Sequence, residues 1–336
     1  MKEPFDDNLI CPVSGENLWV DGDRLATKDG THQYQIENGI IRLFADTETQ
    51  IGDSQATPAA TREVQEFYAA EPFPNYNEFD NIGSFVRHAN QAVFSKLLGQ
   101  QIPPNANVLE VGCGTGQLSN YLAATTMSRI YATDLTIESL ELGHAFAAKN
   151  NIHGNRFIQM NLFAPCIKPE SMDVVISNGV LHHTANTEAA FQSIAKLVRP
   201  GGFIVLGLYN WLGRTRTFLR RRLYKTIGEP ALLLDPVLRA NLSAEKRRAW
   251  ISDQYLHPVE HSHSISEVMA WFEEAEIFFM ASLPKIIGDI RSDEDIFAPV
   301  SSGTRFDRIW AEFSMLFTGP GGEGGVFIMI GQKKPH

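Results

Sequence analysis

Residues 107–117 read Asn-Val-Leu-Glu-Val-Gly-Cys-Gly-Thr-Gly-Gln, a short apolar run that leads directly into a glycine-rich turn. The apolar run predicts a buried strand, and the residues from about Gln117 predict a helix after the turn. Glycine permits a sharp bend and a close approach of a ligand to the backbone, and the start of the helix offers unpaired N–H groups. The stretch therefore predicts a ligand site, built on Gly112, Gly114 and Gly116, at the carboxyl end of a strand.

After this turn the sequence alternates between apolar runs and helical segments. Further strands are expected at 129–134, 156–159, 173–177 and 203–208, and runs at 277–280 and 326–330 are candidates to complete the sheet. Helices are expected from an N-cap at Thr136 to about Asn150, from about Thr187 to Val198, and after the capping-box pattern Ser264-Ile-Ser-Glu267. The alternation predicts an α/β fold: a Rossmann-like, doubly wound, mostly parallel seven-stranded sheet with helices on both faces.

Polar side chains stand at the ends of the predicted strands, where ligands of open α/β sheets bind. Glu110 lies two positions before the first glycine, and a carboxylate there would repel a pyrophosphate but suit a ligand with ammonium and sulfonium charges. Asp134 ends the second strand, the usual place for a carboxylate that binds a ribose diol, with a helix cap as the alternative. Asn161 follows the third strand, where it can hydrogen-bond an adenine edge. Asn178 ends the fourth strand at the same rim, with a turn former as the alternative.

Four motifs carry a resemblance to a known family. They read VLEVGCGTGQ, IYATD, DVVISNGVLHHT and LVRPGGFIVLGLY and follow one another in the chain, and the match covers about residues 107–208. In this order they resemble the successive motifs of class I S-adenosylmethionine (SAM)-dependent methyltransferases of the type 11/12 kind, with weaker support to residue 282 and at 326–332. The resemblance implies SAM as cofactor, bound by Glu110, Gly112, Gly114, Gly116, Asp134, Asn161 and Asn178. Asn161 departs from the pattern, because many relatives carry Asp there.

Candidate catalytic residues follow the fourth and fifth strands, where the acceptor and SAM would meet. His182 and His183 lie after the fourth strand, and Tyr209 ends the fifth. Histidine has the pKa range for proton transfer near neutral pH, and a base is needed only if the acceptor atom is protonated. We expect one of the two histidines to lie in the pocket and the other to be structural, with Tyr209 orienting the acceptor.

The chain divides into three predicted parts. Residues 1–45 form a small β module with Asx-Gly turns, 46–106 a linker and a helical N-terminal lid, and 107–336 the SAM-binding domain with insertions at 210–263 and 284–322. The first part resembles the zinc-ribbon-like module of some tRNA and protein methyltransferases. The second cysteine of the usual Cys-Pro-x-Cys pair is replaced by Ser14, and no second pair exists, so we expect no metal.

Composition limits the compartment and the partners. The net charge of −10 argues against nonspecific nucleic-acid binding by the chain as a whole. Three scattered cysteines, Cys11, Cys113 and Cys166, fit a reducing compartment rather than a disulfide framework. The N-terminus lacks the apolar core of a signal peptide, and no run approaches the ~18 apolar residues of a membrane span. A soluble cytoplasmic protein is therefore expected, of unknown oligomeric state.

Two local clusters leave alternatives open. The segment Arg214–Lys225 holds five arginines, one lysine and no acid among aromatic and leucine residues. It fits an amphipathic basic helix that binds phosphates, RNA or an anionic membrane surface, or a solvated helix face paired to acids of the same protein. The segment His257–His263 clusters three histidines, which are metal ligands, substrate contacts or loop residues.

The sequence favours a SAM-dependent methyltransferase that acts on an unidentified small-molecule acceptor beneath a helical cap over 210–263. RNA or tRNA modification is the second enzymatic alternative, and a SAM-binding or activating module without catalysis is the third. An NAD-dependent oxidoreductase is disfavoured by the G-x-G-x-G spacing and by Glu110.

Overall fold

The computed structural model describes residues 4–45, 50–51, 54–55, 62, 64–66, 68–69, 76, 81–239, 244–257, 259–317 and 325–335. The aromatic, proline-containing part of the predicted lid lies mostly outside these residues. Within the rest of 46–106 the chain forms the short strands β5 (Gln50–Ile51) and β6 (Ser54–Gln55), then the helices α2 (Ile82–Ala89) and α3 (Val93–Gln101).

Seven strands form the central sheet that the sequence predicts. They are β7 (Asn107–Val111), β8 (Arg129–Asp134), β9 (Asn155–Gln159), β10 (Met172–Asn178), β11 (Val198–Tyr209), β12 (Ile277–Leu283) and β13 (Val326–Lys333). Their order is β9-β8-β7-β10-β11-β13-β12, and only β13 runs antiparallel to its neighbours. The predicted Rossmann-like α/β fold is confirmed, and the carboxyl ends of the parallel strands meet at one rim.

The N-terminal β module extends this sheet, which the sequence did not predict. Its strands β1 (Trp19–Asp21), β2 (Arg24–Ala26), β3 (Gln33–Glu37) and β4 (Ile40–Arg42) bring the sheet to eleven strands. The join is parallel pairing of β4 with β9, with Ile41 opposite Ile158, and both side chains are buried in the same core. Asx-Gly turns report local hairpins but not the long-range partner of a strand, so the predicted number of seven strands is too low.

This shared core predicts a cooperative effect on stability. Replacing Ile41, whose side chain is 5% exposed, by Ala should destabilise the whole chain by ~2–4 kcal/mol, because the cavity opens between the module and the central sheet. Thermal unfolding should show one transition at a lower temperature, whereas Val20→Ala in the half-exposed β1 should change little. Two transitions, with the upper one unchanged, would mean that the module folds independently.

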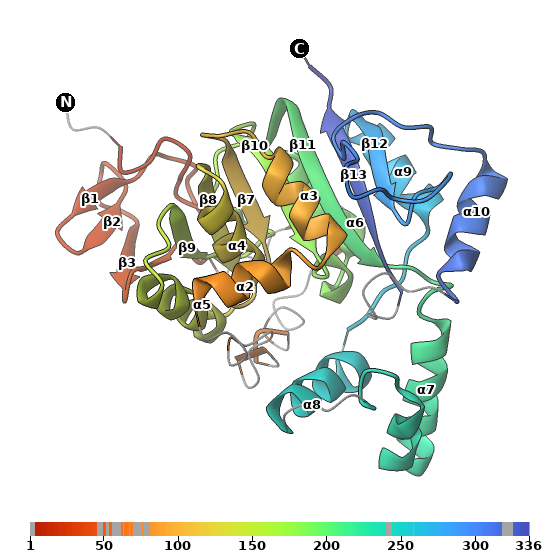
Figure 1. Cartoon of the computed structure of the whole chain (residues 1–336). Helices are drawn as coiled ribbons and strands as arrows, with labels where there is room; N and C mark the ends of the chain where they lie inside the picture. The colour runs from red at the N-terminus through yellow and green to blue at the C-terminus, as the bar shows by residue number, and fades with distance from the viewer. Residues whose placement is uncertain are drawn as a thin grey trace.

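Helices cover both faces of the sheet (Figure 1). One core contains side chains of α2, α3, α4 (Gln117–Thr125) and α5 (Ile137–Lys149), and the other contains side chains of α6 (Thr187–Ala195) and α9 (Ile265–Glu274). Ser264 and Glu267 form the predicted capping box at the start of α9. Thr136 stands at the N-cap of α5, but its side chain makes no capping bond; Asp134 Oδ1 accepts the Thr136 N–H instead.

The first insertion forms a helical lobe that Figure 1 shows projecting from one end of the sheet. It contains α7 (Thr215–Ile227), the short helix η2 (Glu229–Leu234), α8 (Ala244–Ile251) and the π-helical turn η3 (Ser252–Leu256). Leu232, Leu238 and Tyr255 form its small core. The second insertion contains α10 (Arg305–Ser314). Among the described helices, none is long and apolar enough to cross a membrane.

Candidate active site

The glycine turn between β7 and α4 has the backbone that its sequence predicts. Gly112, Gly114 and Gly116 have φ values of 71°, 54° and 71°, in the left-handed region that side chains disfavour. A Cβ on Gly112 would lie 2.4 Å from Val180, and one on Gly116 would lie 2.8 Å from Phe157. Packing therefore also requires the absence of a side chain at both positions.

A cavity of about 360 Å³ opens beside this turn, within the size range of small-molecule sites. Of the residues predicted for the site, Gly116 and His182 do not line it. The others do: Glu110, Gly112, Gly114, Asp134, Asn161, Asn178, His183 and Tyr209. The cavity thus brings together residues from five strand ends that lie up to about a hundred positions apart in the chain.

Glu110, near the end of β7, is a buried carboxyl group that faces the cavity. Its side chain accepts a hydrogen bond from the Ser119 hydroxyl on α4. Burial raises the pKa of Glu110 to about 7, and the Ser119 hydrogen bond only partly offsets this shift. A cation that enters the cavity would favour the ionised form, so the site is suited to a positively charged ligand.

Asp134, at the end of β8, connects the turn to the start of α5. Its two carboxylate oxygens accept hydrogen bonds from the backbone N–H groups of Gly114, at 2.7 Å, and Thr136, at 2.8 Å. Burial raises the pKa of this carboxyl group, and both N–H groups oppose the shift. The helix-cap alternative therefore describes one real contact of Asp134, and the same carboxyl group also lines the cavity.

The two asparagines differ in their surroundings. The Asn161 side chain is buried, and its oxygen accepts the Phe163 N–H at 3.0 Å while its amide donates to the Ala45 carbonyl at 3.4 Å. To contact an adenine edge through this side chain, Asn161 would have to exchange one of these bonds. Asn178 is exposed at the end of β10 and lies over Gly207, where a Cβ would come within 1.9 Å of its oxygen.

The two candidate histidines follow β10 on the short helix η1 (Leu181–His183), and only one of them lines the cavity. The ring of His182 is fully buried behind the cavity, 3.9 Å from the ring of Tyr209, and neither ring nitrogen has a hydrogen-bond partner among the described residues. His183 lines the cavity. Its Nδ1 lies 2.9 Å from the carbonyl oxygen of Val259, which can only accept, so Nδ1 carries the hydrogen and Nε2 is left with a lone pair.

Burial keeps both imidazoles uncharged. It lowers the pKa of His182 well below its usual value and that of His183 to about 4. The Val259 carbonyl and the nearby Glu260 favour the charged form of His183, but desolvation outweighs them. At neutral pH His183 is therefore a neutral ring with a defined tautomer, as a general base requires.

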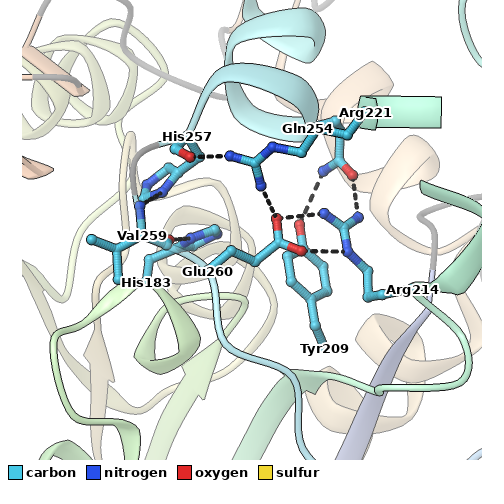
Figure 2. A network of polar contacts seen from close by, with 8 residues as sticks. All are labelled: His183, Tyr209, Arg214, Arg221, Gln254, His257, Val259 and Glu260. Atoms are coloured by element: carbon cyan, nitrogen blue, oxygen red, sulfur yellow. Dashed lines mark hydrogen bonds and ion pairs between the residues drawn. The ribbon is translucent and has the colours of Figure 1, made fainter. Parts of the chain in front are cut away.

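A polar network from the helical lobe holds Tyr209 in place (Figure 2). The Tyr209 hydroxyl accepts a hydrogen bond from Gln254 Nε2 at 3.0 Å, and the Arg214 guanidinium lies 3.8 Å over its ring. Arg214, only 3% exposed, donates to both carboxylate oxygens of Glu260 at 2.9 and 2.7 Å. Arg221 also contacts Glu260 and donates to the His257 carbonyl.

For part of the basic segment Arg214–Lys225, this network agrees with the alternative that its cations pair with acids of the same protein. Two of its six cations, Arg214 and Arg221, face inward to Glu260, and Arg220 pairs with the buried Asp235 at 3.4 Å. Sequence reasoning also missed Trp250 and Gln254, which line the cavity from the lobe. The polar helical segment around these two residues contains no motif that marks them, and only the tertiary fold brings them to the strand ends.

Comparison with known proteins identifies the central segment. Residues 109–206 match the family model described as "Methyltransferase domain". The chain contains a class I SAM-dependent methyltransferase domain. The structure is similar to PKMT2 from Rickettsia typhi, with a TM-score of 0.50 and 13% identity over 71% of this chain and 52% of that one. This is a likeness of fold.

Two curated relatives are similar in sequence to the methyltransferase domain. An uncharacterized protein of Synechococcus is 24% identical over 198 residues, which cover 52% of this chain and 47% of the relative. The ubiquinone biosynthesis O-methyltransferase of Neisseria meningitidis is 31% identical over 105 residues, covering 31% of this chain and 44% of the relative. The chain thus spans less than half the length of these relatives.

The raised pKa of Glu110 gives a prediction for SAM binding. The pKa of Glu110 is about 7 in the folded protein without ligand, against 4.5 for an ordinary glutamate in the unfolded chain. Between these two pH values the unfolded chain has lost the proton that the folded protein still holds. The carboxyl group of Glu110 therefore lowers the stability of the ligand-free protein increasingly as pH rises from 4.5 to 7. A bound cation requires the carboxylate, so the affinity for SAM should rise as pH increases from 6 to 8.

Glu110→Gln should remove this pH dependence and weaken SAM binding at pH 8, while it raises the thermal stability of the ligand-free protein at that pH. Calorimetry at several pH values and a thermal melt measure the two effects. The matched control is Glu138→Gln, an exposed carboxyl group in the first turn of α5. A variant that binds SAM like the wild type at every pH would show that Glu110 does not contact the ligand.

Proposed function

We propose that the chain transfers a methyl group from SAM to a small-molecule acceptor that enters the cavity beside His183. The observation that carries this proposal is the cavity itself: the carboxyl groups of Glu110 and Asp134 line it together with His183 and Tyr209. A donor site and an acceptor site in one enclosed space are what an in-line transfer needs.

The residues at the glycine turn fit SAM. The left-handed glycines let the methionine part pass close to the backbone, and an added Cβ at Gly112 would alter this turn. Glu110 supplies a negative charge toward the ammonium and sulfonium groups, and Asp134, already fixed by two backbone N–H groups, offers its carboxylate to the ribose diol. Asn161, just past β9, is our candidate for the adenine edge, and Asn178, at the end of β10, lines the cavity on the other side of β7.

When bound, SAM supplies a methyl carbon that its sulfonium group activates for displacement. His183 Nε2 accepts the proton of an acceptor hydroxyl as the oxygen attacks, while the Val259 carbonyl holds the ring through Nδ1. Tyr209, fixed by Gln254 and Arg214, orients the acceptor. Trp250 and Gln254 close the cavity on the lobe side and exclude water.

Two points favour a small hydroxylated acceptor. The neutral His183 suits an acceptor atom that must lose a proton, and the helical lobe encloses the cavity as a cap does. The Neisseria relative is described as an O-methyltransferase, although the chain covers only 44% of it. The RNA alternative loses support because Arg214 and Arg221 form ion pairs with Glu260 and so do not present their charges to RNA phosphates.

Incubation of the purified chain with methyl-labelled SAM and fractionated cell extract tests the proposal. We expect label in the small-molecule fraction, in a product whose methyl ether resists alkaline hydrolysis. Label in RNA would establish the alternative acceptor. SAM binding without label in any fraction would contradict catalysis and leave a SAM-binding module.

A further inference from the structure

An aromatic stripe runs along the exposed side of α10. Phe306, Trp310, Phe313 and, just beyond the helix, Phe317 recur at helical spacing, and their side chains are 73%, 63%, 41% and 66% exposed. The last three rings contact one another in sequence, with 5.7 Å between the Trp310 and Phe313 centroids and 5.4 Å between those of Phe313 and Phe317. Three of these four exposed rings are in contact, and the surfaces of soluble proteins seldom carry such a patch without a partner.

The solvent face of α7 continues this stripe with apolar and basic side chains. Phe218 and Leu219 are 57% and 60% exposed, and Arg222 lies one turn further on, with its guanidinium 4.8 Å over the Phe218 ring. Arg216 connects the two helices, because its guanidinium lies 5.8 Å from the Phe317 ring. Figure 1 shows α10 and α7 one below the other along the same edge of the molecule. We call these exposed side chains of α7 and α10 the aromatic–basic face.

The charge exposed on the aromatic–basic face is positive, although the chain carries a net charge of −10. Helix α7 contains no acidic residue. The two acids of α10 are engaged within the protein: Asp307 caps the helix through Thr304, and the 2%-exposed Glu312 accepts from Trp211 Nε1 and the Ile265 N–H. No carboxylate of these helices therefore neutralises the exposed arginines.

We propose that the aromatic–basic face docks on the surface of an anionic lipid bilayer. Tryptophan and phenylalanine insert at the boundary between headgroups and acyl chains, and arginines pair with lipid phosphates, so apolar and electrostatic attraction act together as interfacial binding requires. A second copy of the chain fits less well, because a self-complementary contact would bring arginine against arginine. Docking would bring the helical lobe that covers the cavity to the lipid surface.

Cosedimentation of the full chain with vesicles tests this proposal. Vesicles of phosphatidylcholine, with and without phosphatidylglycerol, are compared at low and high salt. We expect binding to the anionic vesicles that weakens with salt. The double variant Arg216→Glu/Arg222→Glu should lower the partition coefficient at least about tenfold, since each cation near an anionic surface contributes about fivefold. Trp310→Ala/Phe313→Ala should abolish sedimentation.

Matched controls lie elsewhere on the surface. Phe278→Ala removes a 55%-exposed ring of β12, and Lys28→Glu reverses an exposed charge in the N-terminal module; both should bind vesicles like the wild type. SAM titration of every variant shows that the fold is intact. Absence of binding to anionic vesicles at low salt, or binding that the face variants leave unchanged, would overturn the proposal. Dimerisation or RNA binding through this face without vesicle binding would overturn it as well.

Discussion

Replacing Asp134 by Ala should weaken the binding of SAM by about a hundredfold or more. The substitution removes the carboxylate that we propose accepts two ribose hydroxyl groups, and hydrogen bonds to a charged group each contribute about 1.5–3 kcal/mol. It also leaves the Gly114 N–H without the carboxylate that it contacts at 2.7 Å, which loosens the turn that lies against the ligand. Calorimetric titration with SAM measures the loss.

Asp134→Asn separates these two effects, because the amide oxygen can still accept one backbone N–H while the negative charge is gone. We expect Asp134→Asn to keep more of the wild-type thermal stability than Asp134→Ala and still to lose most of the affinity for SAM. The exposed Asp289→Ala serves as a matched control. Wild-type affinity in Asp134→Ala would show that the ribose is bound elsewhere.

Replacing His183 by Ala should lower kcat about a hundredfold to ten-thousandfold, the range of a general base. The KM for SAM should stay close to that of the wild type, because we propose that the ring contacts the acceptor and not SAM. Steady-state kinetics with the acceptor found by the labelling experiment give both constants. His153→Ala, an exposed histidine after α5, is the control.

The pH profile adds a second readout for His183. Because burial lowers its pKa to about 4, His183 stays a neutral base as pH falls from 8 to 5, and kcat should not drop near the ordinary histidine value of ~6.5. A kcat that falls below pH 6.5, or a His183→Ala variant with wild-type kcat, would mean that another group accepts the proton or that alignment alone suffices.

The central sheet was predictable because its information is local. Each parallel strand is a short apolar run followed by a turn, and the order of these runs decides the α/β class. The parallel pairing of β4 with β9 was not predictable. Ile41 and Ile158 are more than a hundred residues apart, and the hairpin signals of the N-terminal module contain no information about β9. Pairing partners depend on tertiary packing, which periodicity does not encode.

The convergence of Glu110, Gly112, Gly114 and Asp134 on one cavity was predictable for a similar reason. Glu110, the glycines and Asp134 stand at strand ends, and strand ends of a parallel sheet share one rim. The surroundings of Tyr209 depend on the insertion. The arginine-rich segment looked like an exposed surface, yet Arg214 is buried against Tyr209 because Glu260, 46 residues later, pairs with it. Which of His182 and His183 faces the cavity follows from the geometry of η1, which two adjacent histidines cannot reveal.

A crystal structure of the chain with S-adenosylhomocysteine, the demethylated product of SAM, would show how the cavity holds the cofactor. We expect the ribose hydroxyl groups within hydrogen-bond distance of the Asp134 carboxylate, the amino group beside Glu110, and the sulfur on the side of the cavity that His183 lines. Product bound away from the glycine turn, or with its sulfur turned from His183, would contradict this expectation.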